Sequence, residues 1–265
     1  MRAAVLYSYS CLCLSCVWSA PAWAEDGGEA TGNQVAVAAD GAPTESSQPD
    51  YQQREVAGWQ VWVSRQLLDE QSENTARALA LMEGQLEQLV KLLPEGVVAE
   101  LKKVPLWVSP EYAKVSPKAE YHPSGDWLKR NGRNPAMAKA VEFTNVRIFD
   151  RECKRMPMLV LHELAHAYHD RVLGNNHAGI KAAYERAKAA GSYDNVEQRF
   201  GDGRSKKVRA YAISNPQEYF AECSEAFWGV NDFYPFNRQE LKELDPTMFA
   251  LLEQLWQTNP QSSPE

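Results

Sequence analysis

Residues 159–169 have the sequence Leu-Val-Leu-His-Glu-Leu-Ala-His-Ala-Tyr-His, and this stretch decides how the rest of the chain is interpreted. Its apolar, helix-forming residues predict a helix, and Pro157 is tolerated in a first turn. Residues four apart on a helix lie one above the other, so His162 and His166 point to the same side and can share a metal ion. Glu163 projects about a quarter turn away, where its carboxylate can hold a water molecule without binding the metal.

The pattern His-Glu-x-x-His is typical of zinc hydrolases, in which the glutamate is the general base. The alternative is that two histidines fall by chance on a helix of the core. A helix buried on most sides has no ordinary structural use for His-Glu-His, which favours the metal site. The sequence therefore predicts a Zn²⁺ cofactor, with His162 and His166 as ligands and Glu163 as the catalytic base.

A catalytic zinc ion needs a third protein ligand, with water in the fourth position. His169 lies one turn further along the same helix, but we interpret it as a surface or core histidine. Glu185 follows at a spacing that some zinc hydrolases use, although its neighbours Lys181 to Arg186 are typical of a solvated helix face.

Glu218 is the better candidate for the third ligand. Glu218, Glu222 and Glu225 fall at positions i, i+4 and i+7 of a predicted helix, with no basic residue between them. A partly buried acidic stripe of this kind requires a cation. We expect Glu218 to bind the metal and Glu222 to accept a hydrogen bond from a ligand histidine. The alternative is that Asn215 and Glu218 only form a capping box at the start of the helix.

Residues 211–222, Tyr-Ala-Ile-Ser-Asn-Pro-Gln-Glu-Tyr-Phe-Ala-Glu, follow His-Glu-x-x-His at a distance. Together these motifs resemble the catalytic domain of anthrax lethal factor and its relatives, which are gluzincin metallopeptidases. The resemblance covers roughly residues 141–228. It implies zinc ligands at His162, His166 and Glu218 and a general base at Glu163, and it places at Tyr211 the tyrosine that supports the transition state.

Residues 121–124 and 231–236 are also similar to uncharacterised exported bacterial proteins that carry the same core. The long additional modules of the toxin have no counterpart in this chain. The resemblance therefore implies a zincin-type α+β fold and peptide-bond hydrolysis, and it implies nothing about the natural substrate.

Composition limits the remaining classes of protein. A chain of 265 residues with 44% hydrophobic content can bury one good-sized core with appendages. A net charge of -7 with scattered Lys and Arg argues against a nucleic-acid partner. We expect a peptide or protein substrate as the partner, and the oligomeric state stays open.

The first 24 residues have the pattern of a secretory signal peptide. Arg2 precedes an apolar run that ends in Ala22-Trp23-Ala24, an A-x-A cleavage site. The protein is therefore expected to be exported, either to the periplasm or to the medium, and a lipoprotein signal at Cys16 is the alternative. Neither this run nor any other segment reaches the length of a transmembrane helix.

Residues 25–50 lack periodicity and are rich in Gly, Ala, Ser and Pro, which predicts a disordered linker. The catalytic domain is expected to span residues 51–260. Cys153 and Cys223 remain after removal of the signal peptide, and they form either a disulfide bond or two buried thiols.

Within the domain we expect a small twisted sheet, an active-site helix and a helical C-terminal half. The predicted strands are 55–63, 104–109 and 140–146, and the last of these could pair with an extended substrate. A β-hairpin is predicted at 196–211, and 119–135 is predicted to be a long structured loop that could act as a lid. Helices are predicted at 74–93, 97–103, 178–190, 215–228 and from 246 onward.

Two other functions stay open at this point. One is a different zinc amidohydrolase acting on cell-wall peptides, and the other is a non-catalytic zinc-binding module. Glu163 argues against the second, because a purely structural zinc site has no need of an acidic residue beside its ligands.

Overall fold

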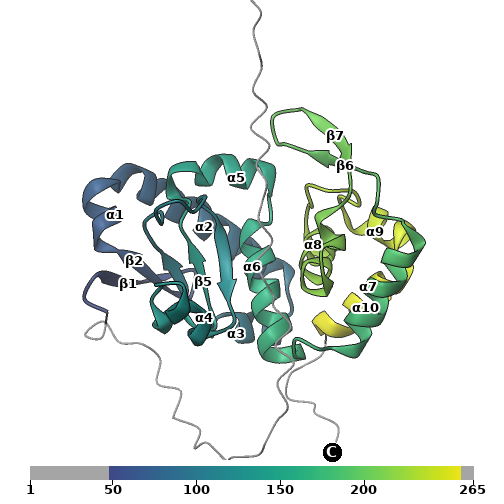
Figure 1. Cartoon of the computed structure of the whole chain (residues 1–265), viewed down its shortest axis with the longest axis horizontal. Coiled ribbons are helices and arrows are strands. Elements are labelled where there is room, and N and C mark those ends of the chain that lie inside the picture. The colour runs from purple at the N-terminus through teal and green to yellow at the C-terminus, as the bar shows by residue number, and fades with distance from the viewer. Residues whose placement is uncertain (1–47, 258–265) are drawn as a thin grey trace, which may run out of the picture. The chain divides into compact units, whose positions relative to one another are not determined.

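The computed structural model describes residues 48–257 (Figure 1). The predicted signal peptide at 1–24, nearly all of the predicted linker and residues 258–260 lie outside the described residues. The described part contains a five-stranded sheet, a two-stranded hairpin and helices, which confirms the α+β class.

The sheet has the strand order β1-β2-β3-β5-β4. Strands β2, β3 and β5 run parallel to one another, and the outer strands β1 and β4 are antiparallel to their neighbours. The central strands are buried on both faces, as expected where helices cover a sheet. Their bounds are β1 Tyr51–Val56, β2 Trp59–Ser64, β3 Leu106–Val108, β4 Ala119–His122 and β5 Ala140–Phe143.

Helix α6, Leu159–Tyr168, lies at the centre of the described residues, and every one of its side chains is buried. On one side it contacts the sheet through β4 and β5, and on the other it packs against α8, Pro216–Trp228. Figure 1 shows the sheet with α1 to α5 on one side of α6, and α7 to α10 on the other. Helix α6 is therefore shared by both halves, and a side chain on α6 can meet groups from either of them.

The other helices are short, apart from the long α2. They are α1 Arg65–Glu70, α2 Ser72–Leu92, α3 Glu95–Leu101, α4 Gly125–Arg130, α5 Phe149–Arg155, α7 Ala178–Ala190, α9 Arg238–Leu244 and α10 Pro246–Gln257. The predictions of α2, α3, α7, α8 and α10 are confirmed to within a few residues at each end, and α1, α4, α5 and α9 were not predicted. None of the helices in residues 48–257 is both long and apolar enough to cross a membrane.

The predicted strand at 55–63 is wrong, because a turn divides it into β1 and β2. Ala57 and Gly58 have positive φ angles of 49° and 88°. Gly58 adopts this geometry without steric cost, and the flanking β-branched and aromatic residues pair across the resulting hairpin.

The predicted loop at 119–135 is also wrong, since it contains β4 and α4. Ser124 caps α4 by accepting a hydrogen bond from the backbone N–H of Trp127, and Asn134 caps the next turn in the same way through Ala136. The Gly, Pro and Asn content that suggested a loop belongs to the caps between these short elements.

The predicted hairpin is confirmed as β6, Val196–Arg199, and β7, Ser205–Val208. Tyr211 lies beyond it in a single 3₁₀ turn, Tyr211–Ile213, that leads into α8. Both cysteines among the described residues are free thiols. Cys153 is half-buried beside Gln85 and Cys223 is buried beside Tyr193, so the two thiols lie in separate places.

Candidate metal centre

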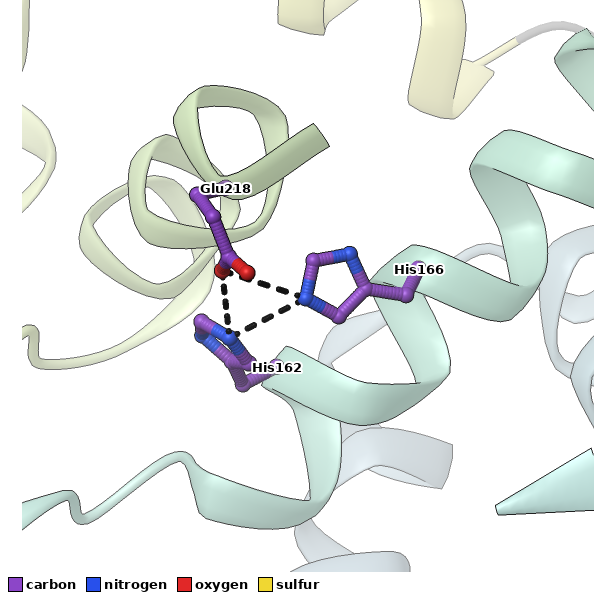
Figure 2. Close-up of side chains that lie close together, drawn as sticks. All are labelled: His162, His166 and Glu218. Carbon is purple, nitrogen blue, oxygen red and sulfur yellow. Dashed lines mark hydrogen bonds and ion pairs between the residues drawn. The ribbon is translucent and has the colours of Figure 1, made fainter. Parts of the chain in front are cut away.

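The two histidines of α6 and Glu218 of α8 point toward one another (Figure 2). The Nε2 atoms of His162 and His166 lie 3.2 Å apart, and Oε2 of Glu218 lies 3.2 Å from the first and 3.3 Å from the second. Ligands that bind one zinc ion tetrahedrally at about 2.0–2.1 Å are separated by about 3.3 Å. The three ligand atoms therefore have the spacing that a single zinc ion requires.

The sequence around Glu218 explains its orientation. Asn215 caps α8 by accepting hydrogen bonds from the backbone N–H groups of Gln217 and Glu218, at 3.0 and 2.9 Å, and Pro216 occupies the first helical position. The carboxylate of Glu218 is therefore not needed for capping. Its Oε2 atom is buried and has no hydrogen-bond partner within residues 48–257, as expected of a metal ligand.

His162 is held by a second carboxylate behind it. Its Nδ1 atom lies 2.7 Å from Oε1 of Glu225, which directs the lone pair of Nε2 toward His166 and Glu218. The sequence analysis expected Glu222 in this role, and that prediction is wrong. Glu222 instead accepts a hydrogen bond from the Nδ2 of Asn231, at 3.2 Å.

The buried histidine and carboxylates of the site shift one another's pKa values. Burial opposes ionisation of His162, but the carboxylates of Glu218 and Glu225 beside its ring outweigh that effect and raise its pKa well above the ordinary value. Burial alone would raise the pKa of Glu218, and the neighbouring histidines instead lower it strongly. Burial raises the pKa of Glu225 to about 7, against the opposing effect of His162. In the absence of a metal, the site therefore favours an ionised Glu218 beside protonated imidazole.

Glu163 is 3% exposed and lies next to the edge of the sheet. Its Oε2 atom accepts a hydrogen bond of 2.9 Å from the backbone N–H of Tyr121 in β4. Burial raises the pKa of Glu163, and the two ligand histidines partly oppose the rise. A carboxyl group with a raised pKa is suited to accepting a proton and returning it.

Tyr211 contacts the site through Glu218. Its hydroxyl donates a hydrogen bond of 3.1 Å to Oε1 of Glu218. Burial and the charge of Glu218 raise the pKa of Tyr211, so this phenol remains a hydrogen-bond donor at neutral pH.

The remaining sequence candidates do not join the site. Glu185 is exposed on α7, as its neighbours indicated. His169 is a core histidine, whose ring lies 5.2 Å from that of Phe220 and whose pKa is lowered to about 4 by burial. Neither of its nitrogens has a hydrogen-bond partner among the described side chains and backbone.

The sequence analysis missed two contributions to the site. The backbone of Tyr121 was assigned to a loop. The only sequence signal for a strand there was an aromatic residue between polar neighbours. Glu225 was recognised as part of the acidic stripe, but its contact with His162 depends on how α8 packs against α6.

The site thus combines three converging ligand atoms, a buried carboxylate next to them and a half-buried phenol. This donor set fits a zinc ion, because two imidazoles and one carboxylate leave a fourth position open. Comparisons of this chain with protein-family models, with curated proteins and with solved structures find no match.

Proposed function

We propose that this protein is an exported zinc metallopeptidase of the gluzincin type with a zincin-like fold. The observation that carries the proposal is the triangle formed by His162, His166 and Glu218, with sides of 3.2–3.3 Å. Its support is the position of Glu163, which is buried against the same site without belonging to the triangle.

His162, His166 and Glu218 would hold a zinc ion, which would supply Lewis acidity toward a water molecule and a scissile carbonyl. Glu163 accepts the proton of the attacking water and delivers it to the leaving amine. The N–H of Tyr121 holds Oε2 of Glu163, which fixes the direction of the carboxylate during both transfers. The hydroxyl of Tyr211 donates to the oxyanion that develops on the substrate.

An extended peptide substrate can pair with the open edge of β4. Strand β5 was expected to pair with substrate, but it lies between β3 and β4 and its backbone is already paired on both sides, so that prediction is wrong. Within residues 48–257, strand β4 pairs only with β5, and the N–H of Tyr121 points from its other edge toward the site. A peptide added along this edge passes beside Glu163.

The test begins with metal content and activity of the mature chain. We expect about one zinc ion per chain and hydrolysis of a denatured protein. Glu163→Gln should retain zinc and the fold but lose at least about 100-fold in rate, because the amide cannot accept the proton. Tyr211→Phe should retain zinc and lose roughly 10²–10³-fold in rate.

Peptidoglycan fragments provide the second substrate class in the same assay. Hydrolysis of these fragments alone would replace the peptidase proposal with a cell-wall amidase. A protein that binds no stoichiometric transition metal, even when zinc is supplied, would contradict both enzymatic proposals.

A further inference from the structure

A cavity of about 280 Å³ lies between the β6–β7 hairpin and the turn that carries Tyr211. We call it the hairpin pocket, and its walls include Gln198, Lys206, Arg209, Tyr211 and Phe233. Tyr211 belongs both to this pocket and to the candidate metal centre, where its hydroxyl contacts Oε1 of Glu218 at 3.1 Å. The pocket and the metal centre therefore share one wall.

The lining of the hairpin pocket includes two basic residues, Lys206 and Arg209, and no acidic residue. Residues 196–209 carry five basic and two acidic side chains, whereas the whole chain has a net charge of -7. Arg209 is partly neutralised by Asp194, with its Nε 3.2 Å from Oδ1. Lys206 forms no ion pair within the described part of the chain, and its ammonium group lies 5.2 Å from the ring centroid of Phe200. Lys206 is thus the cation most open to a ligand in the pocket.

The hairpin is held in a fixed position against the rest of the domain. A side chain at Gly201 in its turn would come within 2.2 Å of the backbone oxygen of Lys154, so the turn is pressed against α5. Gln198 forms a β-bridge with Phe233, and the N–H of Arg199 donates to the carbonyl of Asp232 at 2.8 Å. The pocket is therefore formed before any ligand binds.

We propose that the hairpin pocket receives an acidic side chain, Asp or Glu, of a peptide substrate, with Lys206 as the residue that selects it. An extended peptide advances about 3.3–3.4 Å per residue. Because one wall of the pocket contacts Glu218 through Tyr211, the selected side chain lies within about two residues of the scissile bond. This inference rests on the proposed peptidase function.

The experiment uses two libraries of blocked peptides that differ at one fixed position, which is glutamate in one library and glutamine in the other. Binding is measured to the zinc-loaded Glu163→Gln variant, and cleavage to the wild-type enzyme. The specificity variant is Lys206→Glu. Lys207→Glu is the matched control, because Lys207 is exposed on the same strand, points to its other face and does not line the pocket.

We expect the glutamate library to bind about twofold to fivefold more tightly than the glutamine library, which is the range for a partly screened ion pair. Lys206→Glu should abolish or reverse this preference, and Lys207→Glu should preserve it. Equal affinity for both libraries, or equal effects of the two lysine variants, would overturn the proposal. Tighter binding of peptides with a free C-terminal carboxylate would also overturn it, since the pocket would then select a chain end.

Binding and cleavage separate the two proposals. A preference for glutamate without cleavage of any peptide would leave the pocket in place and contradict the peptidase function. Cleavage without a preference for glutamate would support the peptidase function and contradict the proposed role of the pocket.

Discussion

Two groups of acidic side chains lie in different parts of the molecule, one on the sheet and one on α8 and the segment that follows it, and they are neutralised in different ways. The sheet cluster consists of Glu120, Glu142, His122 and Arg133, on the face that does not contact α6. The site cluster consists of Glu218, Glu222, Glu225 and Asp232, beside and behind the candidate zinc ligands.

The carboxylates of the sheet cluster find their hydrogen-bond and ion-pair partners within the cluster and its neighbours. Glu142 accepts from the hydroxyl of Tyr112 at 2.7 Å and pairs with Nε2 of His122 at 2.9 Å. Arg133 donates to Glu120 at 2.8 Å and lies 3.5 Å from Glu142. Every carboxylate oxygen of this cluster has a partner or contact with solvent. These contacts tie β4 and β5 to the segment that follows α4, so the cluster stabilises the edge strand.

In the site cluster, some buried carboxylate oxygens lack a hydrogen-bond partner among the described residues. The arginine beside these four acidic groups is the half-buried Arg155, whose Nη1 lies 3.2 Å from Oδ2 of Asp232. Buried oxygens of Glu218, Glu225 and Asp232 have no hydrogen-bond partner within residues 48–257. The comparison shows that buried carboxylates do not by themselves indicate a metal site. In the site cluster, Oε2 of Glu218 lacks a hydrogen bond and also lies 3.2–3.3 Å from two imidazole nitrogens, and this combination supports the proposed metal site.

The largest expected effect is a loss of zinc affinity at Glu218, compared with Glu185, a carboxylate outside both clusters. Glu218→Gln replaces an anionic ligand oxygen with a neutral one, so zinc affinity should fall by more than the ~10–100-fold of a supporting residue. Glu185→Gln, on the exposed face of α7, should leave affinity unchanged. Competition with a zinc chelator measures both. If Glu185→Gln released the metal and Glu218→Gln held it, the assignment of the third ligand would be wrong.

A smaller effect distinguishes the two clusters directly. Glu225→Gln weakens the support of His162 and should lower zinc affinity by about 10–100-fold. Glu142→Gln should leave zinc affinity unchanged but reduce the free energy of unfolding by about 1–3 kcal/mol, because it disturbs a satisfied buried network. Chelator competition and denaturant unfolding provide the two measurements. A larger loss of affinity in Glu222→Gln than in Glu225→Gln would restore the sequence-based assignment.

The smallest effect concerns the folding stability of the zinc-free protein. The contributions of Glu142 and Glu225 to this stability change with pH in opposite directions. Burial opposes ionisation of Glu142, but His122 and further hydrogen bonds lower its pKa, so it contributes stability above the ordinary pKa that is lost as pH falls below about 4.5. The pKa of Glu225 is raised to about 7, so the folded state binds more protons than the unfolded state between pH 4.5 and 7. Stability from Glu225 therefore declines as pH rises through that window.

Denaturant unfolding of the zinc-free protein across pH 3–8 measures both contributions. Glu142→Gln should reduce the acid dependence, and Glu225→Gln should reduce the decline between pH 4.5 and 7. An unchanged profile in both variants would mean that the two clusters do not control these transitions.

Much of the secondary structure could be predicted because it depends on local patterns. The spacing of apolar residues predicted α7 and α8, and Asn215 with Pro216 marked where α8 begins. The turn at Ala57 and the short elements β4 and α4 were missed, because a pattern of β-branched or polar residues continues through them. In a short element, tertiary contacts outweigh local preference.

The sequence alone determined that His162 and His166 share one helix face and that Glu218, Glu222 and Glu225 form a stripe on another. Helical periodicity is a local property, so these relations hold wherever the two helices lie. Only the tertiary structure decided that Glu225 meets His162 and that the N–H of Tyr121 meets Glu163. These contacts join residues 63 and 42 positions apart. They depend on how α8 and β4 pack against α6, which no local pattern specifies.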